Sequence, residues 1–300
     1  MKKYKLSLQS SVVGRANLET YIEAAKKEQF DFIEPTKIQL KYYLDAGHTP
    51  EDVKKLLDKL KISSVGWLAD IDCKESEDLK KLLIEAEELF SLAHSVGSDA
   101  VEIINGPVDW HAVDCYQKGR AYEGYQGLLG VRKEEQEKIM VRNLQLLADL
   151  AKEYELTLFF EPLCWTPFPS LREGLPLVEK ANRDNLKVVV DFYHNYMAGV
   201  TLEEIAAIDK KYILGVHICN SKEPDDRVPC EEIFRDAGFY GGVIPIKDWV
   251  EAVKKTGFDG WWAYETFSKE EIEKEIYGFV HDVHEELEKL LGGNENVIKN

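Results

Sequence analysis

Four polar residues follow four short apolar runs of this chain, and their side chains have the chemistry of a metal site. They are Glu161, Asp191, His217 and Glu265, at intervals of 30, 26 and 48 residues. These intervals approximate one, one and one-and-a-half strand-plus-helix units, so consecutive parallel strands closed into a barrel would bring the four side chains together. Three carboxylates and one imidazole suit Mn²⁺, Mg²⁺ or Co²⁺, and Zn²⁺ is a further possibility.

The elements that must position these residues alternate between short β-type runs and longer stretches of helical period. The expected strands cover residues 5–9, 30–34, 62–67, 100–104, 157–161, 187–191, 213–218 and 261–265. The expected helices cover residues 18–28, 76–96, 133–154, 171–182, 202–208, 246–256 and 270–291, with one more opening at Thr49-Pro50. Strict alternation predicts a parallel sheet. Eight units favour an α/β fold with a single (β/α)8 TIM barrel over a doubly wound sheet, which binds its ligand at one crevice.

We expect residues 1–291 to form one catalytic barrel domain and residues 292–300 to form a flexible tail. Two connections are long: residues 105–132 follow the fourth expected strand, and residues 219–243 follow the seventh. Long loops on the active face of a barrel commonly act as lids or substrate walls. The alternative for both loops is a contact between subunits.

Composition excludes several classes of partner. The formal net charge of −17 and the pI near 5.0 argue against nucleic acid, whose phosphates need clustered Lys and Arg. No run approaches the roughly 18 apolar residues of a membrane span, and no secretory signal is visible. The five cysteines are scattered and odd in number, which predicts a reducing cytoplasmic location without disulfides.

Three further residues are candidates for the pocket. His194 lies three residues after Asp191, so it can face the same pocket as a substrate contact or as an orienting group without binding the ion. Trp165 is a candidate for stacking on a sugar, and Glu102 is a candidate pocket residue near a strand end. The alternatives are a loop histidine without a role, an aromatic side chain in core or lid packing, and a solvated carboxylate.

The order Glu161, Asp191-x-x-His194, His217, Glu265 resembles the xylose-isomerase-like TIM barrels over about residues 5–291. It is most similar to the sugar isomerases and ketose 3-epimerases, and to the related inosose and dehydroshikimate dehydratases. The resemblance implies that Glu161, Asp191, His217 and Glu265 hold one divalent ion, often manganese. It also implies that His194 contacts a substrate oxygen.

The chain departs from the epimerases at one position. Epimerases of this kind place an Arg shortly after the ligand that matches His217. Here the nearest is Arg227, ten residues on, and Arg235 is a second candidate. We expect Arg227 to bind substrate, although the longer loop leaves open which of the two arginines does so.

The expected function is that of a divalent-metal-dependent isomerase or epimerase acting on a ketose or a related keto-polyol. A metal on a carbonyl and a neighbouring hydroxyl acidifies the intervening C–H and stabilises the enediolate. Glu161 and Glu265 would bind the metal and also shuttle the proton. The main alternative is a lyase whose reaction forms the same kind of enolate. It would be either an inosose-type dehydratase or an enzyme that eliminates a β-substituent from an oxidised sugar or glycoside.

Two other classes fit less well. An endonuclease-IV-type repair enzyme needs a histidine-rich trinuclear zinc site, and only His194 and His217 are well placed here. A non-catalytic binding protein would be favoured by failure to bind any divalent ion.

The expected partners are a small sugar or keto-polyol and further copies of the chain, since dimers and tetramers are common in the family that it resembles. A second type of subunit stays open.

Overall fold

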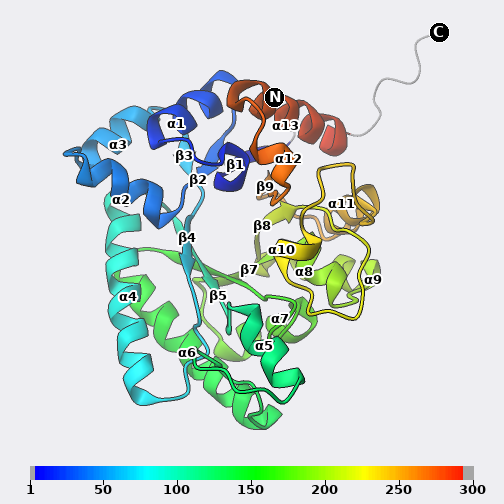
Figure 1. Ribbon diagram of the computed structural model, residues 1–300. Coiled ribbons are helices and arrows are strands. Elements are labelled where there is room, and N and C mark those ends of the chain that lie inside the picture. The colour runs from blue at the N-terminus through cyan, green and yellow to red at the C-terminus, as the bar shows by residue number, and fades with distance from the viewer. Residues whose placement is uncertain (1–3, 293–300) are drawn as a thin grey trace.

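The computed structural model describes residues 4–292, in which parallel strands form a nearly closed barrel with helices around it (Figure 1). The strands lie in the order β3-β2-β1-β9-β8-β7-β6-β5-β4. They are β1 (Lys5–Gln9), β2 (Phe32–Glu34), β3 (Lys61–Ile62), β4 (Val65–Leu68), β5 (Ala100–Ile104), β6 (Thr157–Glu161), β7 (Leu186–Asp191), β8 (Ile213–Ile218) and β9 (Trp261–Tyr264). The predicted TIM barrel is therefore confirmed.

The sheet has nine strands instead of eight because the third expected strand is divided. β3 pairs only with β2, and β4 pairs only with β5. Between them, the Ser63 side chain donates to the carbonyl oxygen of Ile33 at 3.1 Å and contacts the hydroxyl of Ser7 at 2.9 Å. A single parallel bridge between Thr36 and Gly66 joins the two sides of the seam. One strand position of the barrel is thus filled by two short segments.

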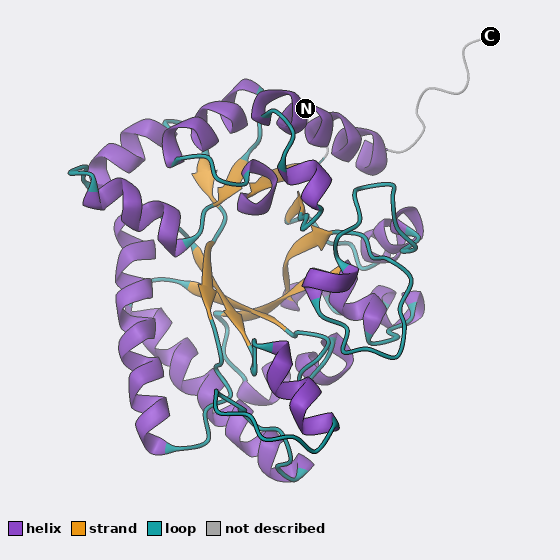
Figure 2. Ribbon diagram, in the orientation of Figure 1, coloured by secondary structure: helices purple, strands orange, loops and turns teal. Residues whose placement is uncertain are grey.

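The helices surround the strands, which form the inner ring in Figure 2. They are α1 (Leu18–Lys27), α2 (Lys37–Asp45), α3 (Pro50–Leu57), α4 (Ser76–Ser95), α5 (Trp110–Gln117), α6 (Lys133–Glu153), α7 (Leu171–Ala181), α8 (Phe192–Met197), α9 (Leu202–Ala206), α10 (Glu231–Phe234), α11 (Ile246–Lys255), α12 (Lys269–Ile272) and α13 (Ile276–Gly292). Local capping explains where some of them start, and α3 is one example. Thr49 and Asp52 form a capping box with Pro50 in the first turn of α3. The helix expected over residues 270–291 is divided into α12 and α13.

Side-chain alternation along the strands positions the site. Phe159, Val189 and Ala263 pack together in a small cluster that is separate from the larger core. Successive side chains of a strand point to opposite faces, so residues two positions apart share a face. Glu161, Asp191 and Glu265 each come two residues after a member of this cluster. The same inward face therefore carries apolar side chains within the barrel and carboxylates at the carboxyl ends of the strands.

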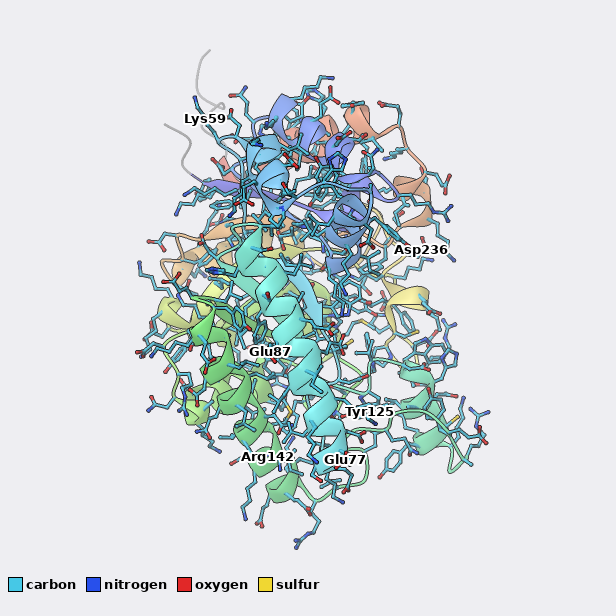
Figure 3. All side chains as sticks on the ribbon, turned by 90° about the vertical axis from the view of Figure 1, so that its left-hand side faces the viewer. Lys59, Glu77, Glu87, Tyr125, Arg142 and Asp236 are labelled. Atoms are coloured by element: carbon cyan, nitrogen blue, oxygen red, sulfur yellow. The ribbon has the colours of Figure 1, made fainter. Side chains whose placement is uncertain are left out.

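Two long loops lie at the end of the barrel where these strands finish. Figure 3 shows Tyr125, in the loop after β5, and Asp236, in the loop after β8, on the right-hand side of the view, with Lys59 on the left. The carboxylate of Asp72 holds the first loop by accepting hydrogen bonds from the backbone of Gly106 and Leu128, both at 3.1 Å, and from the Tyr125 hydroxyl at 2.9 Å. The loop is thus anchored through a buried polar group.

Two expectations concern the ends of the chain and the membrane. Of the tail predicted for residues 292–300, Gly292 ends α13, and residues 293–300 lie outside the described part. Within residues 4–292, no helix is both long and apolar enough to cross a lipid bilayer.

Candidate metal centre

The ends of four neighbouring strands bring together the four predicted ligands. Glu161 ends β6, Asp191 ends β7, His217 lies one residue before the end of β8, and Glu265 follows β9. One ligand atom from each residue lies within 4.8 Å of the others, and all four side chains are buried. The convergence that the sequence predicted is therefore present in the structure.

His217 lies at the centre of this group. Its Nδ1 is 3.2 Å from Glu161 Oε1 and 3.3 Å from Glu265 Oε2. Its Nε2 is 3.0 Å from Glu34 Oε2. Burial lowers the pKa of His217, but the negative charges of Glu265, Glu161 and Glu34 outweigh burial and raise this pKa well above its usual value.

Both oxygens of Asp191 have hydrogen-bond donors. The backbone N–H of His194 donates to Oδ1 at 2.7 Å, because Asp191 caps the start of α8. Arg235 Nη2 donates to Oδ2 at 2.7 Å, and the Cys219 thiol donates to the same atom at 3.3 Å. These contacts fix the orientation of the carboxylate toward the centre.

Arg235 is the arginine that the fold brings to the site. It is 1% exposed, and its Nη2 also donates to Glu265 Oε2 at 2.5 Å, while Nη1 donates to Glu231 Oε1 at 2.6 Å. Arg227, which we expected to bind substrate, is instead exposed and paired with Asp225 at 2.6 Å. The spacing of Glu231 and Arg235, four residues apart, is a helical signal that could have identified α10, although it does not show that Arg235 folds inward.

A cavity of about 240 Å³ opens beside the centre. Its described lining residues are Gln9, Ser10, Glu34, Pro35, Thr36, Ser64, Gly66, Trp67, Glu102, Ile104, Val108, Glu161, Leu163, Trp165, Glu231, Glu265 and Phe267. Glu161 and Glu265 therefore reach the space in which a substrate would lie, whereas Asp191 and His217 are not part of its wall. The predicted pocket residues Glu102 and Trp165 also line it.

The carboxyl groups around the cavity differ in their affinity for protons. Burial tends to raise the pKa of Glu161, but the hydrogen bond and charge of His217 hold it below its usual value. Burial raises the pKa of Glu265 to about 7, against the opposing charges of Arg235 and His217. Burial, together with the charge of Glu161, raises the pKa of Glu102 well above its usual value.

His194 lies directly behind the cavity and does not belong to its lining. Its Nδ1 accepts a hydrogen bond from the backbone N–H of Cys164 at 3.2 Å, and its Nε2 is 3.5 Å from Glu231 Oε1. The ring of Trp165 meets it edge-on at 5.6 Å, and the Trp165 indole N–H donates to the carbonyl of Pro107 at 3.0 Å. Trp165 thus presents its ring to the cavity in a fixed position.

Sequence reasoning missed three residues at the site. Glu34 ends β2, is 5% exposed and contacts His217. Gln9 ends β1, and its side-chain amide donates to Glu265 Oε1 at 3.0 Å. Glu231 comes from the loop after β8. Glu34 and Gln9 each stand at the end of an expected strand, and this position is the signal that could have identified them. Glu231 lies in a loop, so no strand end pointed to it.

Comparison with known proteins places the fold in a family. A family model described as xylose isomerase-like TIM barrel matches residues 22–283. The chain belongs to this family. No curated protein sequence matches it significantly.

Three solved structures have a similar fold. The IolI protein, described with a binding zinc atom, superposes with a TM-score of 0.79 at 20% identity over 96% of this chain and 98% of that one. The probable 3-DHS dehydratase AsbF from Bacillus anthracis gives 0.68 at 16% identity over 95% and 99%. An L-ribulose 3-epimerase gives 0.65 at 18% identity over 99% and 89%. At these identities the likeness shows the shared fold.

The residues present fit a divalent ion. Three carboxylates and one imidazole are hard oxygen and nitrogen donors of the kind that bind Mn²⁺, Mg²⁺ or Zn²⁺. The buried Oε1 atom of Glu34, beside His217, has no hydrogen-bond partner in the described structure, which marks this region as short of positive charge or donors. Within residues 4–292 this group of possible ligands contains one histidine, unlike the histidine-rich trinuclear site of a repair endonuclease.

Proposed function

We propose that this protein is a divalent-metal-dependent isomerase or epimerase of a ketose or a related keto-polyol. The observation that carries the proposal is the division of the four candidate ligands. Glu161 and Glu265 line the cavity, whereas Asp191 and His217 lie behind it. Two carboxylates that reach both the ion and the substrate can move a proton on a carbon held between them.

Glu161, Asp191, His217 and Glu265 would hold the ion, with Mn²⁺ the first candidate and Mg²⁺, Co²⁺ or Zn²⁺ as alternatives. The bound ion would polarise a carbonyl and its neighbouring hydroxyl and stabilise the negative charge of an enediolate. Of the structural relatives, the one described with a zinc atom supports metal binding in this fold.

The chain's own residues supply the remaining steps. One of Glu161 and Glu265 would remove the proton from the substrate carbon, and the other would return a proton at the same or the neighbouring carbon. Trp165 would form one wall against the substrate, and Glu102 and Glu231 would accept or donate hydrogen bonds to its hydroxyl groups. His194 would act through Glu231, from which its Nε2 is 3.5 Å distant.

The decisive experiment separates metal binding from proton transfer. Glu265→Gln protein would be loaded with Mn²⁺, its metal content measured, and its turnover followed on a panel of ketoses and keto-polyols. Retained metal with loss of turnover by a factor of roughly 100 or more is the expected outcome for a group that transfers the proton. Near-normal turnover would end the assignment. Glu77→Gln, on the exposed surface of α4 and paired with Lys80, serves as the matched control.

A metal-dependent lyase is the second candidate, and Glu102 favours it. Its carboxyl group lines the cavity next to Glu161 and has a raised pKa, so it can donate a proton to a departing β-oxygen. A probable dehydratase among the structural relatives has the same fold. Chromatography of the products distinguishes the two reactions. New sugar isomers indicate an isomerase, and a conjugated enone that absorbs in the ultraviolet indicates a lyase.

A further inference from the structure

Among the residues that the structure describes, those in the wall of the cavity beside the metal centre include acidic groups and no basic side chain. Five of its described lining residues are glutamates, and none is lysine, arginine or histidine. Enzymes that take phosphorylated or carboxylated substrates place Arg or Lys where the anion lies, because these side chains pair with it. The wall of this cavity offers no such partner.

The buried cation next to the cavity is already paired. Arg235 donates from Nη2 to Asp191 and Glu265 and from Nη1 to Glu231. It is 1% exposed and is not part of the cavity wall. To reach a substrate anion it would have to leave three carboxylates uncompensated in a buried site, which is costly.

The charge balance stays negative when the ion is included. Asp191 and the five lining glutamates are six carboxyl groups, and Arg235 with a divalent ion supplies three positive charges. Protonation of one carboxyl and of His194, whose Nε2 lies 3.5 Å from Glu231 Oε1, still leaves one negative charge in excess. In a cavity walled by protein this charge acts at lower effective dielectric than in water, and it repels a second anion.

Among the described residues, the outer wall also lacks a cationic side chain. It includes Trp67, which is 46% exposed, and the partly buried Val108. The N-terminus of α2 lies at this wall, because Thr36 lines the cavity. Its capping box is complete, however, since Gln39 N–H donates to Thr36 Oγ1 and Thr36 N–H donates to Gln39 Oε1. These two backbone donors are therefore not available to a phosphate.

We infer that the natural substrate is uncharged, a neutral ketose or keto-polyol that carries neither a phosphate nor a carboxylate group. The inference rests on the proposed function and narrows its substrate class. It favours free sugars and inositol-type ketones over sugar phosphates, uronates and carboxylated ring ketones such as 3-dehydroshikimate.

The test compares matched ligands on the Mn²⁺-loaded protein. Free ketohexoses are paired with their 6-phosphates, and a keto-inositol is paired with 3-dehydroshikimate. Binding is measured by calorimetry and turnover by chromatography. We expect the neutral member of at least one pair to bind, and the anionic member of that pair to bind roughly 100-fold more weakly or worse, because like charges brought together cost several kcal/mol.

The outcomes separate the two claims. Equal or tighter binding of the phosphate esters or of 3-dehydroshikimate would overturn the inference, while turnover of any ketone in the panel would leave the proposed function intact. If no member of any pair binds to the metal-loaded protein, the proposed function fails and the inference fails with it.

A charge introduced at the outer wall gives an independent check. Trp67→Lys places an ammonium group at the rim, and Trp67→Gln removes the indole without adding charge. We expect the ratio of neutral to phosphorylated binding to fall by roughly tenfold or more in Trp67→Lys and to change little in Trp67→Gln. Metal content and thermal midpoint confirm that both variants are folded. An unchanged ratio in Trp67→Lys would contradict the electrostatic explanation.

Discussion

Glu34 holds the ring nitrogen of His217 that faces away from Glu161 and Glu265. The distance from Glu34 Oε2 to His217 Nε2 is 3.0 Å, and both side chains are buried. An ionised carboxylate only accepts hydrogen bonds, so this contact keeps the proton on Nε2. The other nitrogen, Nδ1, is then the one that can offer its lone pair to an ion. Carboxylates that orient ligating histidines in this way raise the basicity of the ring.

Glu34→Ala and Glu34→Gln therefore have graded effects on metal affinity. We expect Glu34→Ala to weaken Mn²⁺ binding by roughly 10- to 100-fold, the range for lost partners of ligating histidines. Glu34→Gln should lose less, because its amide oxygen still accepts from Nε2. Titration calorimetry with Mn²⁺ measures both, with Glu77→Gln as the surface control. Wild-type affinity in Glu34→Ala would show that His217 needs no such partner.

The sequence predicted the four candidate ligands because all of them occupy the same kind of position. Each stands at or next to the end of an apolar run, and strand alternation then places it on the inner face. The same argument predicted most of the barrel, with β1, β5, β6 and β8 at their observed bounds. The division of one strand at Ser63 was not predictable, because it depends on which neighbour each half pairs with.

The sequence could not place residues that reach the site from loops. Arg227 and Arg235 both follow β8 at distances that fit a long loop, and local sequence does not show which of them folds inward. The difference comes from tertiary charge: Arg235 finds Asp191 and Glu265 on two other strands, whereas Arg227 pairs with its near neighbour Asp225. Glu231 enters the cavity from the same loop, where it pairs with Arg235 on its own helix and lies 3.5 Å from Nε2 of His194.

Replacement of Arg235 should destabilise the metal-free protein. Arg235→Met leaves the buried carboxylates of Asp191 and Glu265 without their cation, and breaking a buried pair of this kind costs about 3–5 kcal/mol. Arg235→Lys should lose less, because it keeps the charge without the planar fork. Urea unfolding measures the free energy of unfolding in each variant.

Added Mn²⁺ should recover part of that loss. An ion that binds only the folded state stabilises it by an amount that grows with the logarithm of the ratio of ion concentration to Kd, and here it also supplies positive charge to the same carboxylates. The unfolding free energy of Arg235→Met should therefore rise more on addition of Mn²⁺ than that of Glu77→Gln. An equal rise in both proteins would mean that Arg235 and the ion do not share these carboxylates.

Asp70 should make stability depend on pH. Burial raises its pKa to about 6, with further contributions from the charges of Asp72 and Asp109. The folded state therefore binds this proton more tightly than the unfolded state, so stability falls as the pH rises from about 4 to about 6. Asp70→Asn removes the titration, keeps an acceptor for the Val108 N–H and suits the positive φ of 53° at this position.

The expected result for Asp70→Asn is a gain of about 1–2 kcal/mol at pH 7, reduced from the full linkage value because the side chain is partly exposed. The gain should shrink toward zero near pH 4. Unfolding curves at several pH values measure it, and the exposed Asp45→Asn provides the comparison. A gain that does not vary with pH would show that Asp70 is not the titrating group.

Gly215 leaves the space that the indole of Trp261 fills inside the barrel. A Cβ atom at this position would lie 2.2 Å from two carbons of the Trp261 ring. That ring packs edge-on against Phe159 at 6.1 Å and lies 5.6 Å from the ring of His217. Gly215→Ala should therefore destabilise the protein by about 1–3 kcal/mol, the usual cost of overpacking, and weaken Mn²⁺ binding by pushing the indole toward His217.

A double substitution tests this steric explanation. Trp261→Phe removes the part of the ring that the new methyl group would meet, so the unfolding free energies of the two single variants should not add in Gly215→Ala/Trp261→Phe. We expect the double variant to recover both stability and Mn²⁺ affinity relative to Gly215→Ala. Gly241→Ala, where the nearest atom lies at 3.5 Å, is the control for a methyl group added without a clash. Additive losses at Gly215 and Trp261 would show that the two positions do not compete for the same space.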